Sequence, residues 1–253
     1  MLKDARGAVY VEFLLVFMPV FLLFLCIVEL GFVYAARLVV QHAATRAVRA
    51  AVVILDDDPA RYAGERRGRV DLTGTAGAPS PLEAFMDGAG LGGGASDAAG
   101  GPRFRDIRTA ASIPLLAVAP SAAELDDETG GSIATAIGRG ADRAASGAQR
   151  YNRAALAVTF PTAPGASTTR TEFGAEDLVT VRVTYLFHCA VPLVPELMCE
   201  GPSALSADLS PAEQAQVDIA FLSSLASARF LVLRGEATLR NQGAAYLYPG
   251  ELP

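Results

Sequence analysis

A single carboxylate interrupts the longest apolar run in the chain. Residues 6–30 read RGAVYVEFLLVFMPVFLLFLCIVEL, and Glu12 stands five residues after Gly7. An ionised carboxylate in hydrocarbon costs about 2.5 to 3.5 kcal/mol on membrane-insertion scales. A run that served only as an anchor would carry an apolar residue at this position. Glu12 is therefore a candidate functional residue.

Cys189 and Cys199 are the next candidates, and their chemistry depends on the compartment. They bracket the stretch CAVPLVPELMC, in which two prolines force a tight course. In an oxidising compartment we predict a Cys189–Cys199 disulfide, which for a loop this short stabilises a fold by about 2 to 3 kcal/mol. The alternative is a pair of buried thiols. Apart from the adjacent His188, the spacing offers no partner suited to tetrahedral zinc, so we predict no metal and no cofactor.

Few groups of residues in the sequence have the types and spacing that catalysis requires. The chain has two histidines, His42 and His188, and both are interpreted as structural. The serines and carboxylates provide no spaced set of nucleophile, base and orienting group, and no Gly-Lys-Ser/Thr follows the glycine-rich stretches. We therefore expect a protein that is not an enzyme. The enzymatic alternative is a membrane-anchored periplasmic hydrolase.

The charge distribution separates the first 55 residues from the rest. They carry five basic and three acidic side chains, so the net charge of −6 leaves −8 for residues 56–253. An acidic chain without tryptophan or basic clusters is a poor match for nucleic acid. We exclude nucleic acid as a partner.

The element that must position Glu12 is a membrane-spanning helix. The sixteen residues 13–28 are uncharged and would rise about 24 Å, whereas the 29 residues 8–36 would rise about 43 Å and cross core and headgroups. The helical pattern continues to residue 55 and stops before Pro59. Glu29 is expected near the far headgroups, within reach of water. A cleaved secretory signal is the alternative, but two glutamates interrupt its apolar core.

Two features of this helix leave alternatives open. Four phenylalanines recur at helical spacing and form either a lipid-facing surface or a packing seam for sister helices: Phe13, Phe17, Phe21 and Phe24. Basic residues flank the span on both sides in nearly equal number, so the positive-inside rule does not fix its orientation.

The N-terminal pattern as a whole resembles a known family. A short basic leader ends in Gly7. It is followed by AVYVEF, then by an apolar helix with an early proline, a VELG element, and a helix of small residues that carries arginines. This order is similar to that of the TadE-like minor pilins of tight-adherence (Tad) pili, over about 45 residues. The resemblance implies processing by a prepilin peptidase between Gly7 and Ala8.

The resemblance also implies a task for Glu12. Cleavage after Gly7 gives Ala8 a free amine, and in pilin assemblies the carboxylate at the fifth mature position pairs with such an amine on a neighbouring subunit. Two charges that are costly alone become tolerable together. Because Glu12 lies four residues after Ala8, a pair within one chain is the alternative before assembly. Ala8 departs from classical type IV pilins, which often begin with phenylalanine.

The remaining chain predicts an α+β fold with an antiparallel sheet. Residues 56–102 are rich in glycine and alanine and are predicted to be a flexible loop region. The elements expected beyond it are a helix over 132–151, a strand over 154–161, a half-buried strand over 178–188, a helix from the capping box at 210–213 towards 226, and one or two closing strands over 228–243.

Together these predictions divide the chain into four regions. They are a leader (residues 1–7), a transmembrane and amphipathic helix (residues 8–55), the loop region (residues 56–102), and a periplasmic or extracellular α+β domain (residues 103–253). The resemblance implies a minor pilin or pseudopilin that crosses the inner membrane once, supports pilus assembly and surface adhesion, and reaches the cell surface as part of a pilus. The implied partners are the prepilin peptidase, other pilins and minor pilins, and the Tad assembly platform. The alternative is a membrane-anchored periplasmic binding or adhesin domain that never enters a filament.

Overall fold

The fold is mixed α+β, as predicted, with a long apolar N-terminal helix followed by a domain built on a three-stranded antiparallel sheet. The computed structural model describes residues 6–72, 100–120, 140–225 and 228–243. Its elements follow in the order α1 (Arg6–Ile54), η1 (Pro59–Tyr62), α3 (Pro102–Leu115), α5 (Gly140–Ala155), β1 (Leu156–Thr159), β2 (Leu178–His188), α6 (Pro195–Met198), α7 (Pro202–Asp208), α8 (Pro211–Gln214), α9 (Ile219–Ser224) and β3 (Phe230–Arg240).

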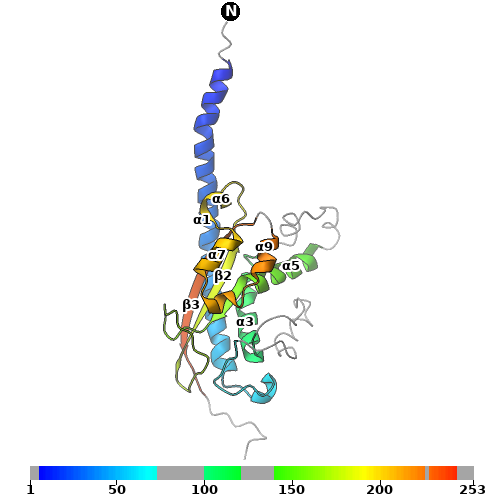
Figure 1. Cartoon of the computed structure of the whole chain (residues 1–253), viewed down its shortest axis with the longest axis vertical. Helices are drawn as coiled ribbons and strands as arrows, with labels where there is room; N and C mark the ends of the chain where they lie inside the picture. The colour runs from blue at the N-terminus through cyan, green and yellow to red at the C-terminus, as the bar shows by residue number, and fades with distance from the viewer. Residues whose placement is uncertain (1–5, 73–99, 121–139, 226–227, 244–253) are drawn as a thin grey trace, which may run out of the picture.

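α1 is one continuous helix of 49 residues, although Pro19 lies inside it. At 1.5 Å per residue it rises about 74 Å. Its N-terminal half stands away from the molecule and its C-terminal half lies along the domain (Figure 1). No residue from Tyr10 to Val28 is buried, and Glu29 is the first that is fully buried. Among the described elements, α1 is the one helix long and apolar enough to cross a membrane.

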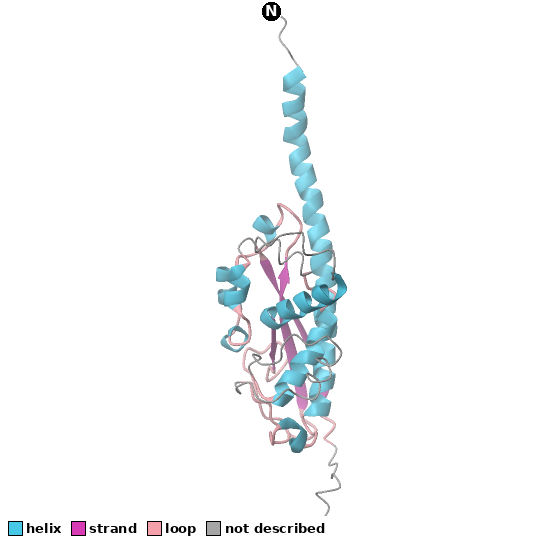
Figure 2. Ribbon diagram, turned by 90° about the vertical axis from the view of Figure 1, so that its right-hand side faces the viewer, coloured by secondary structure: helices cyan, strands magenta, loops and turns pink. Residues whose placement is uncertain are grey.

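Small residues let the C-terminal half of α1 lie close against the sheet. Its buried positions recur at steps of three and four and form one stripe along the helix. The stripe shares a single core with the valines of β2, and β2 and β3 run roughly along the axis of α1 (Figure 2). The stripe consists of Ala36, Val40, Ala43, Ala44, Ala47, Val48 and Ala51.

β2 is the central strand of the sheet. It pairs over its whole length with β3, from Leu178 opposite Arg240 to His188 opposite Phe230, and four residues of β1 pair on its other side. The predicted bounds of this strand are correct, but the prediction that it is half-buried is wrong. Thr184, on the polar face, is only 1% exposed, because its hydroxyl donates to Glu213 and the chain beyond β2 covers it.

Glutamine side chains close both edges of the sheet. On β3, Gln41 of α1 donates to the carbonyl oxygen of Glu236 at 2.6 Å and accepts from its N–H at 3.3 Å. On β1, Gln216 donates to and accepts from the backbone of Val158, with both distances 2.8 Å. Each amide takes the place that a further strand would occupy, so these edge groups are satisfied within the chain.

Two predicted helices differ from the observed ones. The described part of the first is α5, which begins at Gly140, and residues 121–139 lie outside the described residues. The helix expected over 210–226 is two short helices. α8 has the predicted capping box, but the N–H of Asp218 donates to the carbonyl of Ala154 and its side chain caps the new helix α9. A tertiary hydrogen bond therefore interrupts the helix.

Part of the predicted loop region is built into the domain. Residues 56–72 include η1 and bury Tyr62 and Val70, while residues 73–99 lie outside the described residues. α3 follows, and no sequence pattern predicted it. It buries four charged side chains, Arg103, Arg105, Asp106 and Arg108, and this removes the hydrophobic periodicity by which a packed helix is recognised.

Candidate functional site

The predicted processing and assembly residues lie in the free half of α1. Gly7 and Ala8 are in its first turn, and Glu12 follows about one turn later. The side chain of Glu12 is exposed, and among the described residues its carboxylate has no hydrogen-bond or ion-pair partner. It is the sole charged residue between Gly7 and Glu29 in the sequence. The helix thus presents one unpaired carboxylate on an otherwise apolar surface.

An aromatic stripe follows Glu12 on the same free half. Phe13 and Phe17 stack with ring centroids 5.4 Å apart, and Phe17 and Phe21 stack at 5.6 Å. All three rings are between 38% and 60% exposed. Exposed rings are what both a lipid-facing surface and a seam for sister helices require.

Glu29 marks the point where α1 meets the domain. The expectation that it reaches water is wrong, because its side chain is fully buried and accepts a hydrogen bond from the N–H of Val191 at 3.2 Å. Val191 belongs to the loop that the Cys189–Cys199 disulfide closes, and this disulfide confirms the predicted pairing. The Glu29 carboxylate and the two sulfurs lie within 4.8 Å of one another. Disulfide sulfurs are not thiolates, so the oxidised cluster lacks the ligands of a metal site.

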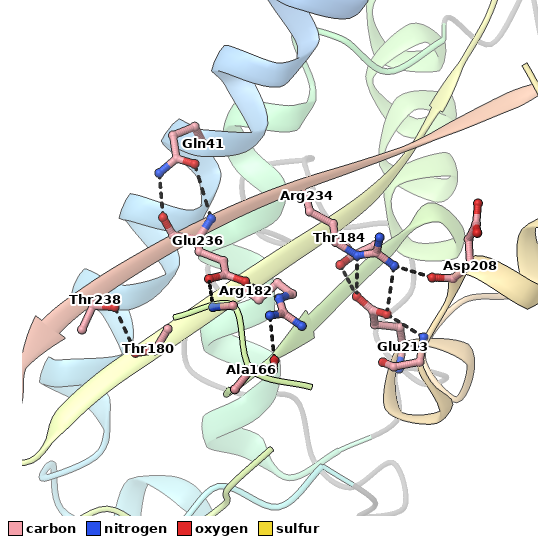
Figure 3. Close-up of polar contacts among 12 residues, drawn as sticks. Gln41, Ala166, Thr180, Arg182, Thr184, Asp208, Glu213, Arg234, Glu236 and Thr238 are labelled. Carbon is pink, nitrogen blue, oxygen red and sulfur yellow. Dashed lines mark hydrogen bonds and ion pairs between the residues drawn. The ribbon is translucent and has the colours of Figure 1, made fainter. Parts of the chain in front are cut away.

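α1 crosses β3 at Gly235. A Cβ atom at this position would lie 2.8 Å from the carbonyl oxygen of Val40 and 3.0 Å from the Cα of Gln41. Only glycine permits so close an approach of helix and strand. The next residue, Glu236, receives the side-chain amide of Gln41 (Figure 3). The crossing fixes the register between the helix and the sheet.

Ionic and polar contacts hold the other face of the sheet. Arg182 pairs with Glu236 across β2 and β3, and Glu213 accepts from Thr184 and from Arg234 (Figure 3). Burial by itself raises the pKa of Glu213, but hydrogen bonds from Thr184, Ser210 and Arg234 outweigh it, so the pKa of Glu213 is lowered. The ionised form of this carboxylate thus stabilises the fold at neutral pH, and its contribution is lost as the pH falls through the lowered pKa.

Arg103 of α3 caps the far end of α1. Its guanidinium donates to the carbonyl oxygen of Ile54, the last residue of α1, and to that of Asp57 at 2.9 Å. Its backbone N–H donates to the Glu65 carboxylate, and the guanidinium carbon lies 4.5 Å from the centroid of the Tyr62 ring. Burial lowers the pKa of Arg103, whereas the nearby Glu65 opposes this shift. The cation satisfies helix-end carbonyls and complements the helix dipole.

The two histidines have different surroundings. His42 is exposed on α1, whereas His188, at the end of β2, is buried with its ring centroid 6.0 Å from that of Phe230. A shallow cavity of about 300 Å³ lies elsewhere in the domain, and its lining includes Arg66, Arg67, Arg69 and Glu172. Its arginines are exposed.

Residues 7–49 match the family model described as TadE-like protein. The match begins at Gly7, includes Glu12, and extends over almost the whole of α1. No curated protein and no solved structure matches the chain. The resemblance to TadE-like proteins predicted from the N-terminal residues is confirmed over this segment.

Proposed function

We propose that this chain is a minor pilin or pseudopilin of a Tad-type pilus, processed by a prepilin peptidase after Gly7 and supporting pilus assembly and surface adhesion. The observation that carries the proposal is the division of α1. Its first half is apolar, free and marked by Glu12, while its second half is part of a domain core. The TadE-like match covers both halves.

The free half of α1 is long enough to hold the subunit in the membrane before assembly. From Ala8, the proposed first residue of the mature chain, to Val28 there are 21 residues, which rise about 31 Å as a helix. A bilayer core is about 30 Å thick. The mature helix would therefore cross the core and bring the domain directly to the membrane surface.

The unpaired carboxylate of Glu12 supports its role as an assembly charge. Cleavage would place the amine of Ala8 one helical turn, about 6 Å, from Glu12 along the axis, and Glu12 would pair with the amine of a neighbouring subunit in the filament. Since either charge alone is costly in a low-dielectric environment, the pair favours subunits in correct register. Glu12 acts in this scheme by charge, and the proposal assigns the chain no catalytic activity.

The disulfide supports a location outside the cytoplasm. Disulfides persist in oxidising compartments such as the bacterial periplasm. We place the domain in the periplasm, with α1 crossing the inner membrane once. The proposed partners are the prepilin peptidase, other pilins and the Tad assembly platform.

A second candidate function rests on the arginine-lined cavity. The segment that supplies Arg66, Arg67 and Arg69 lies at the end of the domain opposite the free half of α1 (Figure 1). An arginine fork suits carboxylate and phosphate groups. The cavity therefore favours, as the alternative, a membrane-anchored binding or adhesin domain that does not enter a filament.

We expect the mature chain to begin at Ala8. Gly7 and Glu12 have the spacing that a prepilin peptidase recognises in proteins that this chain resembles. The measurement is the intact mass of the membrane-purified protein from cells with and without the peptidase. An N terminus at Met1 in peptidase-competent cells contradicts the proposal, and one at Ala36 indicates an ordinary signal peptide.

Cys189 and Cys199 are expected to resist alkylation until a reductant is added. The reason is their disulfide, which the proposed periplasmic location preserves. The measurement is the mass added by a thiol reagent in intact spheroplasts, with Cys26, a free and only partly exposed thiol of the apolar helix, as the internal control. Immediate labelling of both residues contradicts the disulfide or the topology.

A further inference from the structure

The geometry of α1 indicates where a membrane surface would meet the domain. Contact between α1 and the domain begins at Glu29, and the free residues before it match the thickness of a bilayer core. Aromatic residues stand at both ends of this span. Tyr10 is 72% exposed, and Phe32 and Tyr34 are 55% and 67% exposed. Tyrosine rings are typical of the headgroup level, and Tyr34 lies 24 positions after Tyr10, about 36 Å along the helix.

The loop over 189–199 lies at this level. Its Val191 donates to Glu29, the first buried residue of α1, and its disulfide lies beside the same carboxylate. α6, which belongs to the loop, lies at the end of the domain from which the free half of α1 emerges (Figure 1). The loop is therefore the part of the domain next to the predicted membrane surface.

The apolar side chains of this loop divide into two sets. Val191 and Val194 are buried, with exposed fractions of 8% and 0%, whereas Leu193 and Leu197 are 57% and 62% exposed. Leu193 also has a backbone φ of 70°, a conformation that a leucine rarely adopts. The disulfide and two prolines constrain the loop, so the two leucines are held outward on a fixed support.

The charged residue between the two leucines is paired. Glu196 accepts from the guanidinium of Arg229 at 2.8 Å, so it does not present an isolated negative charge to an anionic membrane surface. Apolar side chains on a rigid support beside a membrane helix are suited to the boundary between headgroups and acyl chains.

We propose that Leu193 and Leu197 insert into the phospholipid surface of the membrane that α1 crosses. The loop is then a second membrane contact, which fixes the orientation of the domain relative to α1. This inference rests on the membrane-spanning role of α1 in the proposed function. It adds a lipid-binding surface on the domain itself, and release of the subunit into a filament must break this contact.

The natural absence of tryptophan from the chain permits a direct test. We consider full-length single-tryptophan variants in phospholipid vesicles whose acyl chains are brominated near the headgroups. Leu193→Trp and Leu197→Trp are expected to lose most of their emission relative to unbrominated vesicles. The matched control is Leu178→Trp, equally exposed at 63% but at the opposite end of β2, about 33 Å from His188. Its emission is expected to stay unchanged.

A fourth variant separates failure of this inference from failure of the anchor. Leu14→Trp lies in the free half of α1 and is expected to be quenched by lipids brominated deeper in the acyl chain. Quenching at Leu14→Trp without quenching at Leu193→Trp and Leu197→Trp overturns the lipid contact and leaves the anchor intact. The same conclusion follows if the loop variants emit at short wavelength but are unquenched, since another subunit then covers them. An unquenched Leu14→Trp overturns the membrane-spanning role and the proposed function.

Discussion

Replacing Glu12 by glutamine is expected to exclude this chain from pili while its abundance and its processing after Gly7 stay normal. Glutamine is nearly isosteric, and membrane insertion becomes easier without the charge. What is lost is the carboxylate that neutralises the Ala8 amine of a neighbour. Losing one partner of a buried ion pair costs about 3 to 5 kcal/mol, which lowers an association constant by some hundreds- to thousands-fold.

The matched control is Glu29→Gln. It makes the same chemical change on the same helix, but its amide oxygen still accepts from the N–H of Val191. We expect near-normal incorporation of this variant. The measurement is the content of each variant in surface-sheared pili, with the membrane fraction as reference. If Glu12→Gln enters pili as the wild type does, Glu12 is not an assembly charge. If neither the wild type nor the variant is found in pili, the anchored-domain alternative explains the chain better.

Arg103→Met is expected to destabilise the domain by about 3 to 5 kcal/mol. Methionine approximates the length of the aliphatic stem but donates no hydrogen bond. The carbonyl groups of Ile54 and Asp57 then lose a donor, and the half-buried carboxylate of Glu65 loses its compensating cation. The end of α1 is thereby detached from α3, so the loss affects the contact between the long helix and the domain.

The measurement for Arg103→Met is urea unfolding of the detergent-solubilised full chain, monitored by the circular dichroism of the domain. Arg66→Met is the control, because Arg66 is exposed and has no side-chain partner among the described residues. It should change the free energy of unfolding by less than about 0.5 kcal/mol. A loss below about 1 kcal/mol for Arg103→Met would show that the buried cation is not a structural cap.

The features predicted correctly from the sequence are encoded by residues that lie close together in the chain. The long apolar helix follows from composition, and the bounds of β2 follow from an eleven-residue β-branched and aromatic run ended by a cysteine loop. The capping box at Ser210 and Glu213 is encoded within four residues and is present. The disulfide follows from two cysteines that are ten residues apart, with two prolines between them that force a tight course.

The features that were missed depend on contacts between distant residues. The sequence places Glu29 near the headgroups because nothing near it in the chain shows that Val191 covers it. α3 has no recognisable sequence signal because arginines usually indicate an exposed face, whereas Arg108 is buried and donates to three backbone carbonyls. Gly235 did leave a signal, since a glycine inside a strand pattern often marks a close approach of another backbone.

The most direct test of the proposed function is mass spectrometry of the pilus fraction sheared from the surface of wild-type cells. A pilin-like subunit must leave the membrane, so we expect peptides of this chain in the sheared fraction, with Ala8 as the N-terminal residue. The same fraction from cells without the prepilin peptidase should lack the chain, which should remain in the membrane with its leader. Recovery of the chain solely from the membrane fraction of peptidase-competent, piliated cells would contradict the account.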